Sequence, residues 1–159
     1  MTTQSTDTPV RTAVVVQAPI ERAFSVFTDD IGSWWNRDHH ILEGELAEMV
    51  FEPRAGGHIY DRGVDGSECR WARVLVYEPP ERVVFSWDIN LQWQRETDPQ
   101  RTSEVEVRFV SETPERTRVE LEHRGLERHG DGWEQMRGAV ASPGGWPAGL
   151  EAFAQRLMA

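Results

Sequence analysis

The residue whose side chain is best suited to take part in a reaction is a histidine at the end of an alternating strand. From Thr117 to Arg124 the sequence alternates, so Val119, Leu121 and His123 share one face of the predicted strand. An imidazole on a cavity wall can accept or donate a proton near neutral pH. The alternative is a buried histidine whose hydrogen bonds serve only the structure.

An arginine on a second predicted strand leaves its face undecided. Arg73 has the same parity as Trp71, but the residues of the other parity are equally apolar. An inward arginine must be paired, and Glu48, Asp61 or the carboxylate of a ligand are the candidate partners. An outward arginine would lie on the solvated face of the sheet.

The remaining histidines and the single cysteine do not form a recognisable metal or nucleophile motif. His39 and His40 are adjacent and therefore point apart, and neither His58 nor His129 completes an HxxxH or HExxH spacing. Cys69 is alone, so it can form neither an intramolecular disulfide nor an all-cysteine metal site. The chain also lacks a GxSxG motif and a phosphate-binding loop. We therefore predict no metal and no cofactor.

Bulky aromatic residues are the second chemical feature. In the segment 71–89 the residues Val83, Phe85, Trp87 and Ile89 fall on one face, and prolines at 79–80 break the pairing before them. Such residues either fill a core or line an apolar pocket whose indole N–H groups orient a ligand. The candidate cavity residues are Trp34, Trp35, Trp71, Phe85, Trp87, Phe109, Leu121, His123, Trp133, Met136 and Trp146.

Two of these candidates are neighbours in the sequence. Trp34 and Trp35 lie on a short predicted helical turn, where adjacent side chains cannot both face the core. We predict that one packs under the sheet, and that the other caps the mouth of the cavity or is simply exposed.

Composition and charge exclude several classes of protein. The chain has 159 residues and a formal charge of −10, with 17 basic residues that are all arginine. This acidic balance argues against binding to nucleic acid or to an anionic membrane. No apolar run is long enough to span a membrane and no secretory signal is visible, so we expect a cytoplasmic protein. The absence of lysine favours a bacterial source.

The elements that must position these residues follow from periodicity. We expect a disordered tail at 1–9 and one domain at 10–159, with a helix that starts at Pro19 and a helical turn at 31–35. A helical region begins near Trp133, is interrupted at 142–145, and continues as a stripe of Trp146, Leu150, Phe153 and Leu157. Strands are predicted at 10–17, 43–53, 57–63, 69–78, 82–90, 104–112 and 117–124.

Five segments together resemble a known superfamily. The order of elements is similar to the helix-grip fold of the SRPBCC superfamily, and within it to bacterial proteins like the C-terminal domain of the activator of heat-shock protein 90 ATPase. The matching segments are APIERAFSVFTDDIGSWW (18–35), VFEPRAGGHIYDRG (50–63), WARVLVYEPPERVVFSW (71–87), TRVELEHRGLERHGDGW (117–133) and GGWPAGLEAFAQRL (144–157). The resemblance implies an α+β fold in which seven antiparallel strands grip a long C-terminal helix, with a cavity between them.

Three functions are compatible with this resemblance. The first is binding of a small apolar or aromatic molecule in the cavity without catalysis. The second is a polyketide cyclase or dehydratase activity, for which the resemblance suggests His123, Tyr60 and Arg73 as groups that transfer protons or stabilise an oxyanion. The third is interaction with a chaperone, which in this family also uses an N-terminal domain that this chain has no residues to form. The sequence is compatible with a monomer or a homodimer.

Overall fold

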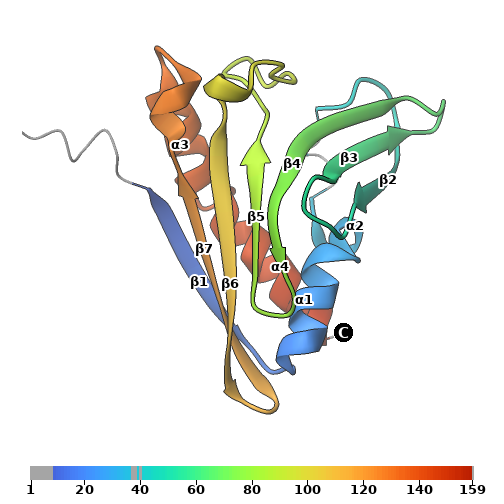
Figure 1. The fold of residues 1–159 in the computed structure, drawn as a ribbon, viewed down its shortest axis with the longest axis vertical. Coiled ribbons are helices and arrows are strands. Elements are labelled where there is room, and N and C mark those ends of the chain that lie inside the picture. The colour runs from blue at the N-terminus through green and yellow to red at the C-terminus, as the bar shows by residue number, and fades with distance from the viewer. Residues whose placement is uncertain (1–8, 37–38, 40, 159) are drawn as a thin grey trace, which may run out of the picture.

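Seven strands form one antiparallel sheet that carries both the core and the site. The computed structural model describes residues 9–36, 39 and 41–158. The strand order is β1-β7-β6-β5-β4-β3-β2 (Figure 1). The strands are β1 Val10–Val16, β2 Leu46–Phe51, β3 His58–Gly63, β4 Glu68–Glu78, β5 Arg82–Trp87, β6 Ser103–Thr113 and β7 Arg116–Arg124. The predicted helix-grip architecture is confirmed.

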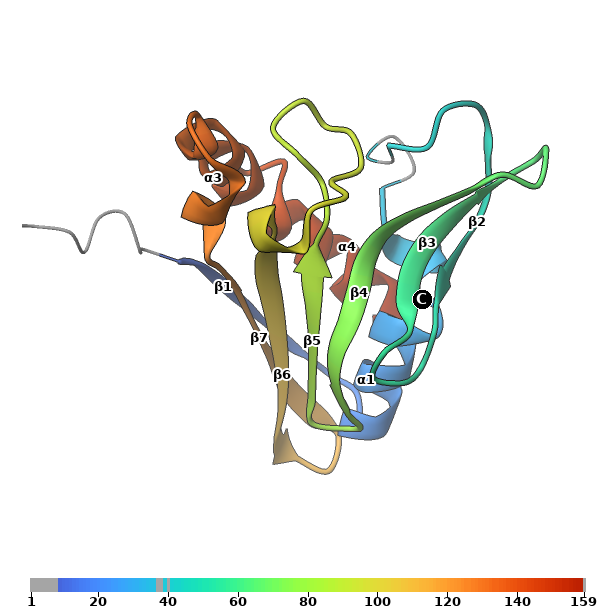
Figure 2. The same cartoon turned by 45° about the horizontal axis from the view of Figure 1, so that its top comes forward.

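The helices lie where the periodicity placed them. Helices α1 (Ile20–Thr28) and α2 (Ile31–Trp34) connect β1 to β2, and the C-terminal helical region is divided into α3 (Trp133–Ala141) and α4 (Trp146–Met158). The sheet curls around α4 (Figure 2). Two short 3₁₀ helices, η2 (Pro99–Arg101) and η3 (Leu126–His129), flank β6 and β7. No helix among the described residues is long and apolar enough to cross a membrane. Residues 1–8 of the predicted tail lie outside the described part of the chain.

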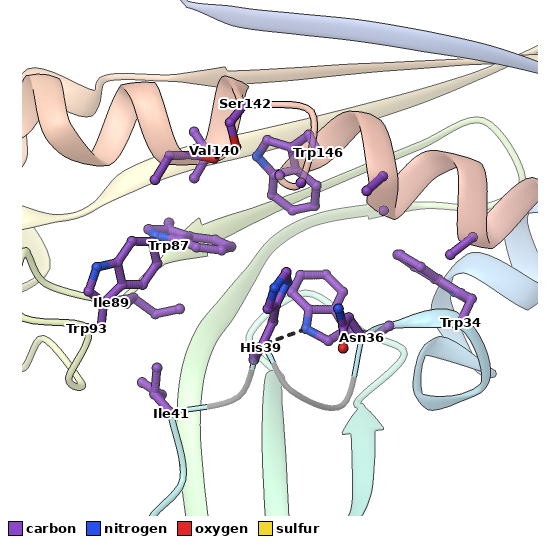
Figure 3. A pocket seen from close by; sticks show the side chains of 17 residues that line it. Trp34, Asn36, His39, Ile41, Trp87, Ile89, Trp93, Val140, Ser142 and Trp146 are labelled. Atoms are coloured by element: carbon purple, nitrogen blue, oxygen red, sulfur yellow. Dashed lines mark hydrogen bonds between the residues drawn. The ribbon is translucent and has the colours of Figure 1, made fainter.

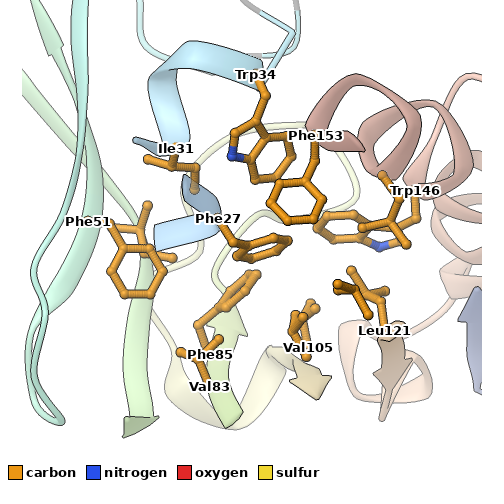
Figure 4. Close-up of a cluster of buried hydrophobic side chains, with 14 of the residues drawn as sticks. Phe27, Ile31, Trp34, Phe51, Val83, Phe85, Val105, Leu121, Trp146 and Phe153 are labelled. Atoms are coloured by element: carbon orange, nitrogen blue, oxygen red, sulfur yellow. The ribbon is translucent and has the colours of Figure 1, made fainter. Parts of the chain in front are cut away.

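The inner face of the sheet and one face of α4 form the core. Phe85 and Phe153 are fully buried, as the alternation of β5 and the stripe of α4 predict (Figure 4). The Phe153 ring contacts Phe27 of α1 at 5.3 Å and Trp34 of α2 at 5.6 Å, both in an edge-to-face arrangement. Helix α4 therefore joins the sheet to the first two helices.

The predicted strand at 82–90 is shorter in the structure. Strand β5 ends at Trp87, and the Asp88 amide donates to the Trp71 carbonyl at 2.9 Å. A single bridge between Ile89 and Arg95 then closes a loop. The cause is a local change of pairing partner, which the alternation of side chains does not reveal.

The outer face of the sheet carries a charge cluster centred on Glu106. Its carboxylate accepts hydrogen bonds from Arg82 Nε at 2.6 Å, from Arg108 Nε at 2.7 Å and from Arg124. Burial opposes ionisation of this carboxyl, but the three guanidinium groups outweigh it and lower the pKa of Glu106 to about 2. The cluster fastens β5, β6 and β7 to one another.

Glu106→Gln is expected to lower the free energy of unfolding by about 3 kcal/mol at pH 7, because it leaves three guanidinium groups without their shared carboxylate. The pKa of Glu106 is lower in the folded chain than in the unfolded chain. Its stabilisation is therefore complete above about pH 4.5 and is lost between pH 4.5 and 2. Urea unfolding of the wild type and the variant across this range tests the prediction. Glu120→Gln removes a half-exposed partner of Arg118 and should cost less than about 1 kcal/mol. Equal losses in the two variants would contradict the assignment.

Candidate functional site

A cavity of about 810 Å³ opens between three segments that are distant in the sequence. Residues of α2 and the following loop form one side, the end of β5 and the loop after it form another, and the junction of α3 with α4 forms the third (Figure 3). Five tryptophans line it, together with three polar side chains and a set of small and aliphatic residues. The tryptophans are Trp34, Trp35, Trp87, Trp93 and Trp146, and the polar residues are Asn36, His39 and Ser142.

The adjacent indoles of Trp34 and Trp35 both reach the cavity because the helix ends between them. Helix α2 stops at Trp34, and Trp35 adopts an extended backbone with ψ of 136°. Trp34 is buried and its Nε1 donates to the Val26 carbonyl at 3.1 Å. Trp35 is half-buried and its Nε1 donates to the His39 carbonyl at 3.4 Å. The two indoles differ in burial, as expected, but both rings line the cavity.

The indoles form a connected aromatic wall. Trp146 contacts Trp35 at 5.7 Å and Trp87 at 5.6 Å between ring centroids, and both contacts are edge-to-face. Trp35 also packs on Trp71, a core residue behind the wall, at 5.2 Å. Edge-to-face packing leaves ring faces directed to a neighbour or to a ligand rather than stacked on each other.

The break between the last two helices shapes the third side. A Cβ at Gly145 would overlap the carbonyl oxygens of Ala139 and Val140, so only glycine permits the close return of the chain at this point. The hydroxyl of Ser142 donates to the Ala139 carbonyl at 2.7 Å and retains its lone pairs. After Trp146, the residues that α4 presents to the cavity are small, namely Ala148, Gly149 and Ala152.

A hydrogen-bonded chain of side chains lies behind the Trp146 ring. Trp146 Nε1 donates to His123 Nδ1 at 3.0 Å, and His123 Nε2 is 2.7 Å from Ser103 Oγ. An indole nitrogen only donates, so a neutral His123 carries its hydrogen on Nε2 and donates it to Ser103. The Ser103 hydroxyl is then free to donate to His129 Nε2 at 2.8 Å. This series of hydrogen bonds fixes the orientation of the Trp146 ring in the wall of the cavity.

Both histidines of this hydrogen-bonded series, His123 and His129, are neutral. His123 is fully buried, and burial together with the neighbouring His129 lowers its pKa to about 3. Burial also lowers the pKa of His129, although Glu96 and Asp88 oppose the shift. Among the described residues, His129 Nδ1 and Trp87 Nε1 are buried without a hydrogen-bond partner.

The three predicted proton-transfer residues are not brought together at the cavity. His123 lies one layer behind Trp87 and Trp146 rather than on the wall. Arg73 lies on the outer face, where its guanidinium forms two hydrogen bonds with Asp88, at 3.0 and 3.1 Å, and not with Glu48, Asp61 or the cavity.

Tyr60 is likewise on the outer face. Its hydroxyl accepts a hydrogen bond from Arg62 at 3.1 Å, and the guanidinium groups of Arg62 and Arg70 lie over its ring. Tyr60 is only 8% exposed, and the two arginines help to shield its ring from solvent. Neither Tyr60 nor the two arginines that contact it line the cavity.

The other predicted cavity residues divide between wall and core. Trp34, Trp35, Trp87 and Trp146 line the cavity. Trp71, Phe85, Phe109, Leu121 and Met136 are buried in the core, and Trp133 is half-buried against it. Sequence reasoning did not identify Asn36, His39, Ile41, Ile89 and Trp93 as lining residues. The position of Asn36 and His39 directly after the tryptophan pair was the available signal.

Within the described residues, no group of three or more His, Cys, Asp or Glu side chains has the geometry of a metal site. Besides the indole N–H groups, the polar side chains that line the cavity offer one amide, one imidazole and one hydroxyl. Such a set can orient a ligand by hydrogen bonds, and the imidazole can also exchange a proton with it.

Comparison with known proteins gives a family and several solved relatives. A family model described as activator of Hsp90 ATPase homolog 1-like protein matches residues 17–157. The structure of an anthrahydroquino-γ-pyrone synthase, Txn09, complexed with SUM, is 40% identical, with a TM-score of 0.66, and the match covers 94% of this chain and 97% of that one. No curated protein sequence matches the chain.

Two further similar structures come from Micromonospora echinospora. CalC, a self-sacrificing resistance protein, is 26% identical with a TM-score of 0.68, over 96% of this chain and 95% of that one. CalU16 is 25% identical with a TM-score of 0.61, over 95% of this chain and 74% of that one.

Proposed function

The chain belongs to the activator of Hsp90 ATPase homolog 1-like family of the SRPBCC superfamily, and from this membership and the geometry of the cavity we propose that it binds a small planar aromatic molecule. The observation that carries the proposal is the lining of five tryptophans around about 810 Å³. A cavity of this size lies in the range of natural small-molecule sites, which are mostly apolar with a few polar groups.

The shape of the wall supports a planar ligand. Indole rings that meet edge-to-face offer a ring face or a ring edge to a flat aromatic molecule, and each such contact contributes about 0.5–1.5 kcal/mol beyond the area it buries. The lone pairs of Ser142 and the amide of Asn36 suit ligand hydroxyl and carbonyl groups. A polycyclic molecule that carries phenolic or quinone oxygens combines both features.

A ring-forming enzyme is the second candidate, and the similarity to a synthase over 94% of the chain favours it. In this case the proton-transfer group is an imidazole in the cavity, and His39 is the histidine that lines it. His39→Ala should then abolish product formation while the binding of a planar aromatic probe persists.

Replacement of one wall indole tests the binding function. Trp35→Ala is expected to weaken the binding of 1,8-dihydroxyanthraquinone about three- to tenfold, because one aromatic contact is lost. Trp133→Ala is the matched control, since Trp133 is also half-buried but does not line the cavity. Fluorescence titration and equilibrium dialysis of both variants and the wild type give the dissociation constants. Unsaturable binding to the wild type, or equal losses in the two variants, would contradict the proposed site.

A further inference from the structure

Trp93 differs from the other indoles of the cavity in its exposure. It is 47% exposed, whereas Trp34, Trp87 and Trp146 are each about 5% exposed or less. In Figure 3 it lies beside Ile89 at one end of the lining, and Trp34 lies at the other end. A large apolar ring that stays half in solvent at a cavity mouth has surface available for a ligand.

The backbone of Trp93 is in an unfavourable conformation. Its φ is 59°, and among the described residues it is the one non-glycine residue with a positive φ. A left-handed backbone is rare for bulky side chains, and such outliers concentrate at ligand-binding sites. Trp93 lines the cavity in this conformation although the residue remains about half exposed.

The loop that carries Trp93 is held firmly in this conformation. The Trp93 amide donates to the Asn90 carbonyl at 2.9 Å, and the Asn90 amide donates to the Gln94 carbonyl at 2.8 Å. The side chain of Asn90 accepts from the amides of Gln92 and Gln94, each at 2.9 Å. Below this turn the Ile89–Arg95 bridge closes the neck of the loop. These contacts fix the strained residue without any contribution from its ring.

We infer that Trp93 is a ligand-binding residue that forms a preset outer wall, so that a bound ligand spans the cavity from Trp34 to Trp93. The inference rests on the proposed function and narrows it. A ligand that contacts both ends must be longer than a single aromatic ring, as an elongated fused-ring molecule is, and its end at Trp93 lies next to solvent. A preset wall also reduces the ordering that binding requires.

Three substitutions separate the ring from the backbone. Trp93→Ala and Trp93→Gly both remove the ring, but only glycine relieves the left-handed backbone, while Trp93→Phe keeps a planar ring. We expect Ala and Gly to weaken 1,8-dihydroxyanthraquinone binding about three- to tenfold, and Phe to weaken it less than about twofold. The Gly variant should melt about 2–4 °C above the Ala variant. Val110→Ala alters a similarly exposed residue on the outer face of the sheet and should leave binding unchanged.

The possible outcomes distinguish this inference from the proposed function. Wild-type affinity in the Ala and Gly variants, with a loss in Trp35→Ala, would overturn the role of Trp93 and leave the proposed function intact. A loss in Gly without a loss in Ala would assign the effect to loop flexibility and overturn the ring contact. A Trp93→Gly variant that melts below the Trp93→Ala variant would show that the backbone at residue 93 is not strained. Absence of saturable binding to the wild type would overturn both proposals.

Discussion

A chain that ends at Gly145 is expected to lose cooperative folding. The truncation removes helix α4 and with it Trp146, Leu150, Phe153 and Leu157, whose side chains are 0–7% exposed. Each large apolar side chain lost from a core costs about 2–5 kcal/mol, whereas the whole stability of a domain is about 5–15 kcal/mol. The loss also removes the contacts of Phe153 with Phe27 of α1 and Trp34 of α2.

Thermal unfolding followed by circular dichroism, together with limited proteolysis, tests this expectation. The matched control is Met158→Ala on the same helix, because Met158 is 75% exposed and its loss should not change the melting temperature detectably. A soluble fragment 1–145 that melts cooperatively would show that the sheet folds without α4 and that the helix is not part of the core.

The architecture could be predicted because long periodic segments report their own burial. The α4 stripe repeats every three to four residues and matches the buried residues of that helix. The alternation of β5 identifies its inner face, although Val84 and Ser86 on the outer face are buried as well. Short links between successive strands imply antiparallel neighbours, and consecutive strands from β2 to β7 are indeed paired. The family resemblance gave the same fold.

The cavity was harder to predict. Alternation shows which side of the sheet a residue faces, but it does not show whether that residue lies in the core or at the cavity wall. Phe85 and Trp87 share the inner face of β5, but Phe85 lies in the core and Trp87 lines the cavity. The difference arises from where α2 ends and where α3 breaks from α4, and both are tertiary features. Trp93 belongs to a loop whose polar composition gave no sign of a binding surface.

Arg73 shows a different limit of sequence reasoning. The register of β4 against β3 shifts between Arg70 and Ala72, opposite Tyr60 and Ile59, and a bulge of this kind changes the parity of the side chains that follow it. Val74 pairs with Phe85 on the inner face, which leaves Arg73 on the outer face with Asp88. Neither the bulge nor the pairing with Asp88 is encoded in local periodicity.

His123→Phe is expected to lower the free energy of unfolding by about 2–6 kcal/mol. The phenyl ring leaves Trp146 Nε1 and Ser103 Oγ without their partner, which costs about 1–3 kcal/mol, and its bulk strains a site that is 0% exposed, which costs a similar amount. His123→Gln is the matched control, because the Gln amide can accept from Trp146 and donate to Ser103. It should retain most of the stability, and it should retain aromatic binding as well, since His123 does not line the cavity.

The two variants also differ from the wild type in their response to acid. The pKa of His123 is about 3 in the folded chain and near 6.5 in the unfolded chain. Above pH 6.5 both forms are neutral, whereas between pH 6.5 and 3 only the unfolded chain takes up the proton, so stability falls by up to about 1.4 kcal/mol per pH unit. His129 adds to this loss, and Glu106 contributes only below about pH 4.5.

Urea unfolding between pH 4.5 and 6.5 therefore isolates the histidines, and His123→Gln should flatten the dependence on pH relative to the wild type. An unchanged slope would show that His123 already takes up a proton in the folded chain. An unchanged melting temperature for His123→Phe, combined with altered binding of 1,8-dihydroxyanthraquinone, would place His123 on the cavity wall. Absence of saturable 1,8-dihydroxyanthraquinone binding by the wild type and the variants alike would contradict the ligand-binding function itself.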